Sequence, residues 1–127
     1  MIIINFSHPL CDHHLERVEQ LCEDKVVRVL ASPAHFDQSL SFVDQAVRLV
    51  DQVGLTAVEW QTERLLVVPP SLAAIACLVV AEIHGRAGYF PPLIRISPQA
   101  GKVPPVYEVC EILDLAGVRE RARLTRQ

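Results

Sequence analysis

The sequence lacks the short motifs that mark the common nucleotide-binding and hydrolytic sites. It contains no G-x-G-x-x-G, no Walker lysine motif, no H-E-x-x-H and no G-x-S-x-G. Its four cysteines also lack C-x-x-C spacing, which argues against a zinc site or a disulfide framework. They fall inside predicted elements, and we interpret them as small core residues: Cys11, Cys22, Cys77 and Cys110.

Neither a strong charge excess nor a long apolar run is present. The 127 residues carry a net charge of −3 and are 50% hydrophobic, which fits one domain over residues 1–127 with a proper core. The last segment is basic, because it contains four arginines and only one acidic residue, Glu120. The arginines are Arg119, Arg121, Arg123 and Arg126. The opening apolar run is too short for a signal peptide or a membrane span. We therefore expect a cytoplasmic protein without a DNA or membrane partner.

Strand and helix patterns alternate along the chain. The apolar run that opens the sequence contains three consecutive isoleucines, which favour a strand buried on both faces. Further strands are expected at 26–31, 65–68, 93–96 and 106–113, and helices at 12–23, 39–53, 71–84 and from 115 onward. The spacing of Thr56 and Glu59 predicts a capping box before the third strand. This alternation predicts an α/β fold with a mostly parallel five-stranded sheet and helices on its faces.

Polar residues gather where the predicted strands end. Asn5, Ser7 and His8 follow the first strand, Ser32 and His35 follow the second, and Pro70 and Ser71 precede the most apolar helix. Ligands of open α/β sheets bind at this edge, and helix N-termini there favour phosphate. The alternative is that Ser7 only caps a helix and that His8 lies on the surface.

Three histidines lie close together in the sequence. His13 and His14 with His8 raise the question of a metal site. Adjacent histidines on a helix point about 100° apart, however, and a third ligand at suitable spacing is missing. We therefore expect no metal and no cofactor.

Four segments carry a resemblance to a known family. They are the opening run with Asn5-Phe6-Ser7-His8-Pro9-Leu10, Glu59-Trp60-Gln61, Pro69-Pro70, and His84-Gly85-Arg86-Ala87-Gly88-Tyr89-Phe90-Pro91-Pro92. In these segments the chain resembles a family of small CRISPR-associated accessory proteins found beside type III systems. Cys11 departs from the family pattern, in which Thr is usual after the Pro-Leu pair.

The resemblance implies a Rossmann-like (CARF-like) domain that recognises a cyclic oligoadenylate second messenger. Such proteins usually act as homodimers, with the ring bound across the two-fold axis, and relatives either sequester cyclic tetra-adenylate or cleave it as ring nucleases. Combining the strand-end argument with this resemblance, we predict these ligand-binding residues: Asn5, Phe6, Ser7, His8, Ser32, Pro70, Ser71, Arg86 and Tyr89.

The expected activity is capture of cyclic tetra-adenylate, which would damp type III CRISPR signalling. Sequestration is favoured because no pair of predicted site residues clearly supplies a general acid and base. If the protein is a metal-independent ring nuclease instead, His8 is the first catalytic candidate. A third alternative is an interaction module without a small ligand.

The predicted site residues fall at two edges of the sheet. A helix antiparallel to the strands would carry Arg86 and Tyr89 to the edge opposite Ser7. Residues 85–92 then form either a helix cap and tight turn or a surface that meets a neighbouring subunit. In the second case a ligand would bridge dimers into larger assemblies.

Overall fold

The first strand lies inside the sheet, between two other strands. The computed structural model describes residues 1–126, and in it β1 (Ile2–Asn5) has all four residues buried. It pairs in parallel with β2 (Arg28–Ala31) on one side and with β3 (Leu65–Val68) on the other. Since β1 has a strand on each side and a helical layer on each face, its β-branched side chains fill the interior. The predicted buried strand is confirmed.

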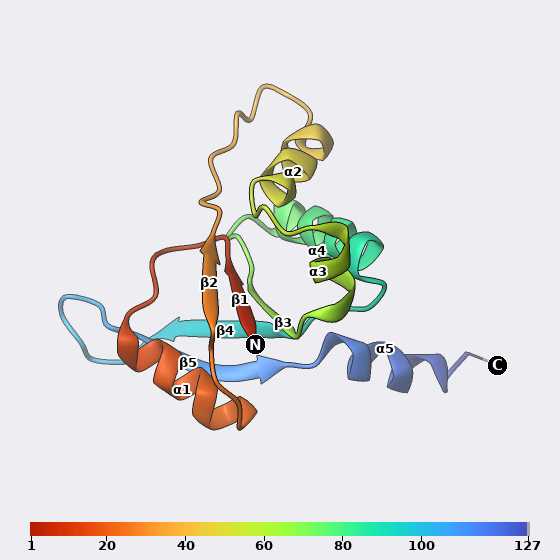
Figure 1. Cartoon of the computed structure of the whole chain (residues 1–127). Helices are drawn as coiled ribbons and strands as arrows, with labels where there is room; N and C mark the ends of the chain where they lie inside the picture. The colour runs from red at the N-terminus through yellow and green to blue at the C-terminus, as the bar shows by residue number, and fades with distance from the viewer. Residues whose placement is uncertain (127) are drawn as a thin grey trace.

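Two later strands complete the sheet. In it β4 (Leu93–Pro98) pairs in parallel with β3, and β5 (Tyr107–Leu113) returns antiparallel to β4 with an irregularity between Arg95 and Ile96. The strand order is β2-β1-β3-β4-β5 (Figure 1). The predicted α/β fold with a mostly parallel five-stranded sheet is therefore confirmed.

Alternate residues of β1 point into two separate cores. Ile2 and Ile4 pack with side chains from α2 (Phe42–Asp51), α3 (Ala57–Thr62) and α4 (Ala73–Ala87). Ile3 packs on the opposite face with Val18 of α1 (Asp12–Cys22). This period of two is the geometry of a pleated strand. Helices therefore cover both faces of the sheet.

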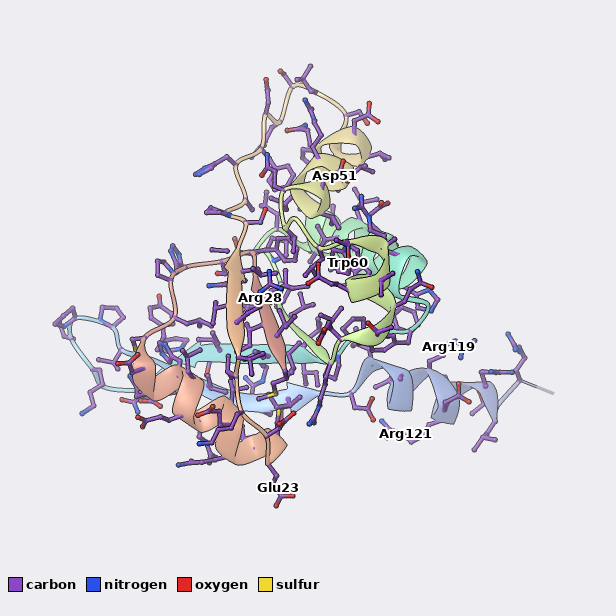
Figure 2. All side chains as sticks on the ribbon, viewed as in Figure 1. Glu23, Arg28, Asp51, Trp60, Arg119 and Arg121 are labelled. Atoms are coloured by element: carbon purple, nitrogen blue, oxygen red, sulfur yellow. The ribbon has the colours of Figure 1, made fainter. Side chains whose placement is uncertain are left out.

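The last helix contributes nothing to either core. Asp114 accepts a hydrogen bond from the backbone N–H of Gly117 at 3.0 Å and so caps α5 (Leu115–Arg123), as the sequence predicts. Among the described residues, α5 has no buried side chain. Figure 2 shows Arg119 and Arg121 on this helix, away from the packed layers.

Two expectations from the sequence are wrong. The helix expected to end at His84 continues through Gly85 and Arg86, and it ends at Gly88, whose φ of +83° is the left-handed conformation of a helix cap. Gly85 is tolerated because a single glycine weakens a helix without breaking it. The interpretation of the cysteines as core residues is wrong for Cys11 and Cys77, which are exposed, whereas the partly buried Cys22 does pack against a core. Within residues 1–126, no helix has the length and apolar character needed to cross a membrane.

Candidate functional site

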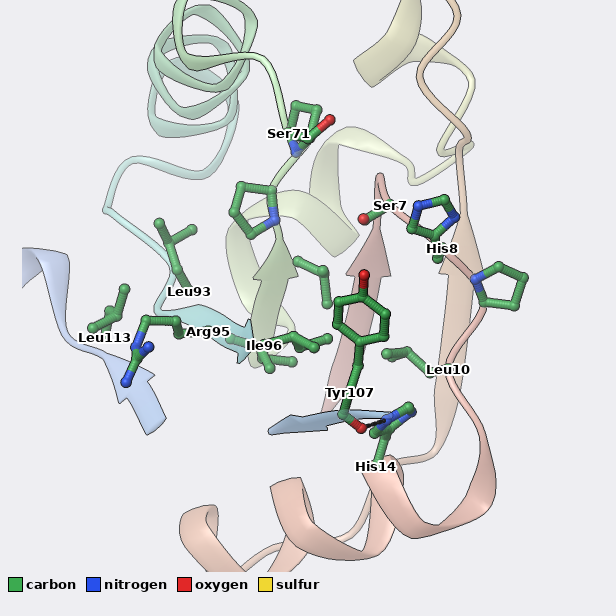
Figure 3. A pocket seen from close by; sticks show the side chains of 15 residues that line it. Ser7, His8, Leu10, His14, Ser71, Leu93, Arg95, Ile96, Tyr107 and Leu113 are labelled. Carbon is green, nitrogen blue, oxygen red and sulfur yellow. Dashed lines mark hydrogen bonds between the residues drawn. The ribbon is translucent and has the colours of Figure 1, made fainter. Parts of the chain in front are cut away.

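A cavity of about 650 Å³ lies beside the carboxyl ends of β1 and β3. The chain runs from β1 to β2 on one side and later returns to β3 on the other, so the direction of winding reverses between β1 and β3. Ligands of open α/β sheets bind at such a switch point. The cavity walls come from three segments (Figure 3), namely 7–10 with His14, 68–71, and the strand pair β4–β5.

The turn after β1 is held by Asn5. The buried Asn5 side chain accepts a hydrogen bond from the Ser7 backbone N–H at 3.0 Å and donates one to the His8 carbonyl at 2.9 Å. Ser7 and His8 themselves line the cavity. Asn5 therefore positions two site residues, while its own amide is engaged within the turn and does not line the cavity.

The turn after β3 supplies the second wall. Pro70 and Ser71 line the cavity as predicted, and α4 begins two residues later. Within the described residues, no side chain caps the start of α4 at Leu72. The N–H groups of its first turn thus lack intrahelical acceptors and give this end a partial positive charge.

The third wall comes from residues that the sequence reasoning missed. Tyr107 begins β5, and its ring extends into the cavity with the hydroxyl directed toward the end where Ser7 and His8 lie (Figure 3). His14 fixes this strand end, because its Nε2 lies 2.8 Å from the Tyr107 carbonyl oxygen. Arg95 of β4 lines the same wall and pairs with Glu111 at 3.1 Å. The sequence predicted the two strands of this wall, at 93–96 and 106–113, but it did not indicate that they pair with each other and line the cavity.

The lining contains basic side chains. Among the described residues that form the cavity there is an arginine, Arg95, and two histidines, His8 and His14, but no Asp or Glu. The aliphatic remainder and the Tyr107 ring suit a flat apolar group. Together these properties match a ligand that joins a phosphate to an aromatic base.

The two histidines differ in their capacity to transfer protons. His14 is buried, its Nδ1 accepts from the Cys11 backbone N–H at 3.1 Å, and its Nε2 is bonded to Tyr107. Both ring nitrogens are thus occupied. His8 is exposed at the cavity wall and is the imidazole that a ligand can reach.

Two predicted site residues belong to the protein interior. Phe6 is 1% exposed and packs in the core beneath α2 and α4. Ser32 is buried, and its Oγ donates a hydrogen bond to the Leu49 carbonyl at 2.8 Å. Neither residue lines the cavity. Ser32 instead ties the end of β2 to a carbonyl near the end of α2.

Arg86 and Tyr89 lie near the opposite edge, as the topology predicts. The Arg86 guanidinium contacts Asp51 at 2.7 Å and Glu82 at 2.9 Å. The Tyr89 hydroxyl donates to the Glu63 carbonyl at 3.2 Å, before β3 begins, and burial raises its pKa. These contacts secure the end of α4 and account for both side chains within one subunit.

The fold and the cavity together define the class of protein. It is an α/β protein with a five-stranded, mostly parallel sheet and a cavity at the switch point. Comparison of the chain with protein-family models, curated proteins and solved structures finds no match.

Proposed function

We propose that the protein is a Rossmann-like (CARF-like) domain that binds a cyclic oligoadenylate, with cyclic tetra-adenylate as the expected ring. The observation that carries this proposal is a cavity at the switch point whose lining has a cation and an aromatic ring but, among the described residues, no carboxylate. The resemblance of the sequence to type III CRISPR accessory proteins narrows the ligand from a nucleotide in general to this messenger.

The cavity offers separate positions for base and phosphate. Adenine would stack on Tyr107, since aromatic side chains bind unpaired bases through their faces. A phosphate would accept hydrogen bonds from Ser7, from Ser71 and from the first turn of α4. Arg95 would exchange its exposed partner Glu111 for the ligand, which a solvated ion pair permits because it is weak.

Capture without cleavage is the function we favour. General acid–base cleavage needs a proton acceptor and a proton donor, and both nitrogens of His14 are engaged in holding the fold. Among the described residues that line the cavity, His8 is then the one imidazole that a ligand can reach. By holding the messenger, the protein would damp type III CRISPR signalling. A metal-independent ring nuclease that uses His8 is the second candidate.

A homodimer would supply the matching half of the site. A two-fold-symmetric ring is bound most simply by two copies of one site across a two-fold axis. Leu72, just before α4, and Ala74 and Cys77 on it are exposed and small or apolar, so this helix is a candidate dimer surface. The ligand-bridged assembly stays a prediction, and it would require Arg86 to leave Asp51 and Glu82.

Calorimetric titration of cyclic tetra-adenylate, followed by chromatography of the recovered ligand, tests the proposal. We expect binding and intact ligand. Tyr107→Ala should weaken binding by about 1–3 kcal/mol, the usual loss for one stacked base. Arg95→Ala should also weaken it, whereas Arg64→Ala, which removes an exposed, ion-paired arginine outside the cavity, should not.

Each alternative has its own outcome in this experiment. A linear product that disappears in His8→Ala would establish the ring nuclease. Absence of binding to any cyclic oligoadenylate would leave an interaction module. Light scattering with and without ligand measures assembly, and growth beyond a dimer that Arg86→Ala abolishes would support bridging.

A further inference from the structure

Three potential metal ligands meet at the start of α1. Cys11 precedes the helix in an extended conformation, with φ −100° and ψ 172°, so its side chain reaches over the first turn. Its Sγ lies 2.9 Å from His13 Nδ1 and 3.2 Å from His14 Nδ1. The expectation that a third ligand is missing is therefore wrong, because the thiol lies between the two imidazoles. We propose that Cys11, His13 and His14 bind a zinc ion.

The spacing of the three atoms is close to that of a zinc site. Zn–S bonds of about 2.3 Å and Zn–N bonds of about 2.0 Å at tetrahedral angles separate sulfur from nitrogen by about 3.5 Å. The ligand atoms of Cys11, His13 and His14 all lie within 4.8 Å of one another. To admit the ion, the two sulfur–nitrogen separations of 2.9 and 3.2 Å would lengthen slightly, and the His14 ring would turn away from the Cys11 backbone N–H.

The hydrogen bonds of His14 select the tautomer that a metal needs. Its Nδ1 accepts from the Cys11 backbone N–H, so the proton is on Nε2, which donates to the Tyr107 carbonyl at 2.8 Å. The Nδ1 lone pair thus lies on the side of the Cys11 thiol. Metal-bound histidines commonly donate their other N–H to a carbonyl or carboxylate in this way. Zinc would replace the Cys11 N–H as the partner of Nδ1.

His13 has a corresponding partner on the same strand. Glu108 Oε1 lies 4.0 Å from His13 Nε2, and Gln99 holds that carboxylate oxygen with a hydrogen bond of 2.8 Å. With zinc bound at Nδ1, the Nε2–H of His13 would be directed toward the Glu108 carboxylate as a hydrogen-bond donor. Consecutive residues of β5, Tyr107 and Glu108, therefore orient the two histidines.

The composition and exposure of the cluster indicate the metal and its coordination. One thiolate and two neutral imidazoles are ligands that suit zinc better than magnesium or calcium. Cys11 and His13 are exposed, which gives the ion a route in, while His14 is buried and anchors the site. Three protein ligands leave the fourth position to water.

Titration of the full chain with Co²⁺ after treatment with a chelator tests the site. Thiolate ligation should produce a sulfur-to-cobalt charge-transfer band together with the intense visible bands of a tetrahedral ion. One equivalent of Zn²⁺ should bleach both. Because the titration contains no nucleotide, its outcome is independent of the function proposed above.

Matched variants separate this site from other thiols and histidines. Cys11→Ser should abolish the charge-transfer band, and His13→Ala should weaken zinc binding. Glu108→Gln, which alters only the orienting carboxylate, should lower zinc affinity about 10- to 100-fold. Cys77→Ser and His35→Ala change an exposed thiol and an exposed imidazole outside the cluster, and both should bind like the parent.

Two results would overturn the proposal. One is a parent protein that shows no charge-transfer band with Co²⁺. The other is a band that survives in Cys11→Ser or disappears in Cys77→Ser. The conclusion does not depend on a His14 variant, whose buried ring also supports β5.

Discussion

Asn5 and Ser7 are two residues apart, and their substitution should have different effects. Asn5→Ala removes two hydrogen bonds made by a side chain that is 2% exposed, so we expect a loss of about 1–3 kcal/mol in the free energy of unfolding. Ser7→Ala should leave stability within about 0.5 kcal/mol and weaken ligand binding. Urea unfolding and calorimetry measure the two quantities separately.

The reverse pattern would reassign these residues. An Asn5→Ala variant that keeps full stability and loses only affinity would place the amide in contact with the ligand. An Ser7→Ala variant that loses stability and keeps its affinity would make Ser7 part of the fold.

For single residues, the sequence predicted the position in the fold better than it predicted what the side chain does. The polar residues after the first strand do lie at the cavity. Ser7 lines it, whereas the Asn5 side chain holds the turn. Ser32 lies at the end of its own strand as expected, yet its hydroxyl is bonded to Leu49. Which way such a side chain points depends on the helix packed beside it, and a local pattern does not contain that information.

Gly85 inside α4 and Gly88 at its end should respond in opposite ways to substitution by alanine. Gly85 lies inside the helix with open space around its Cα, so Gly85→Ala should stabilise the protein by about 0.5–1 kcal/mol. Gly88 ends the helix with φ +83°, so Gly88→Ala should destabilise it by about 1–2 kcal/mol. Thermal unfolding of both variants measures the difference. Equal effects would mean that the helix ends near Gly85, as first expected.

The capping box of α3 should make stability depend on pH. The Thr56 backbone N–H, and then the Arg28 guanidinium at 2.9 Å, hold the pKa of the Glu59 carboxyl below its ordinary value of 4.5. A lowered pKa means that the ionised carboxylate stabilises the folded state above pH 4.5 and that this contribution is lost as the pH falls through the folded-state pKa.

Glu59→Gln tests this contribution, because Gln can still close a capping box. The parent should be more stable than Glu59→Gln at neutral pH, and the difference should shrink below pH 4.5. Glu63→Gln makes the same change of charge at an exposed position just after the helix. A gap between the parent and Glu59→Gln that stays constant down to pH 2 would refute the assignment.

Elements were predicted well where local chemistry decides them. Three of these predictions are confirmed. They are the capping box of Thr56 and Glu59, the cap of α5 by Asp114 and the buried strand 65–68. The boundaries of α4 were wrong, because a glycine inside a helix and one at its end look alike in a sequence. Only the backbone dihedral angle separates Gly85 from Gly88.

The last helix should be dispensable for folding. Since none of its described residues is buried, ending the chain after Gly117 should change the free energy of unfolding by less than about 1 kcal/mol. Urea unfolding of the shortened and full chains measures this. A large loss of stability would contradict this expectation and show that the folded state depends on contacts made by α5.

At the scale of the molecule, the pairing of distant segments was the hardest part to predict. The alternation of strands and helices predicted the sheet, and the carboxyl edge of β1 predicted part of the cavity. Tyr107 and Arg95 reach the same space only because β5 turns back antiparallel beside β4. A strand pattern does not reveal its partner or direction, so this wall lay beyond reasoning from the sequence.

The interior position of β1, with a strand on each side, also sets the order in which the protein can assemble during synthesis. Both neighbours of this strand are made later, and Leu65–Val68, which completes its pairing, lies halfway along the chain. Until that segment leaves the ribosome, three fully apolar isoleucines have no sheet to enter. A nascent chain of this design therefore keeps an apolar segment without its full set of strand partners during the first half of its translation, and segments exposed in this way are prone to aggregate.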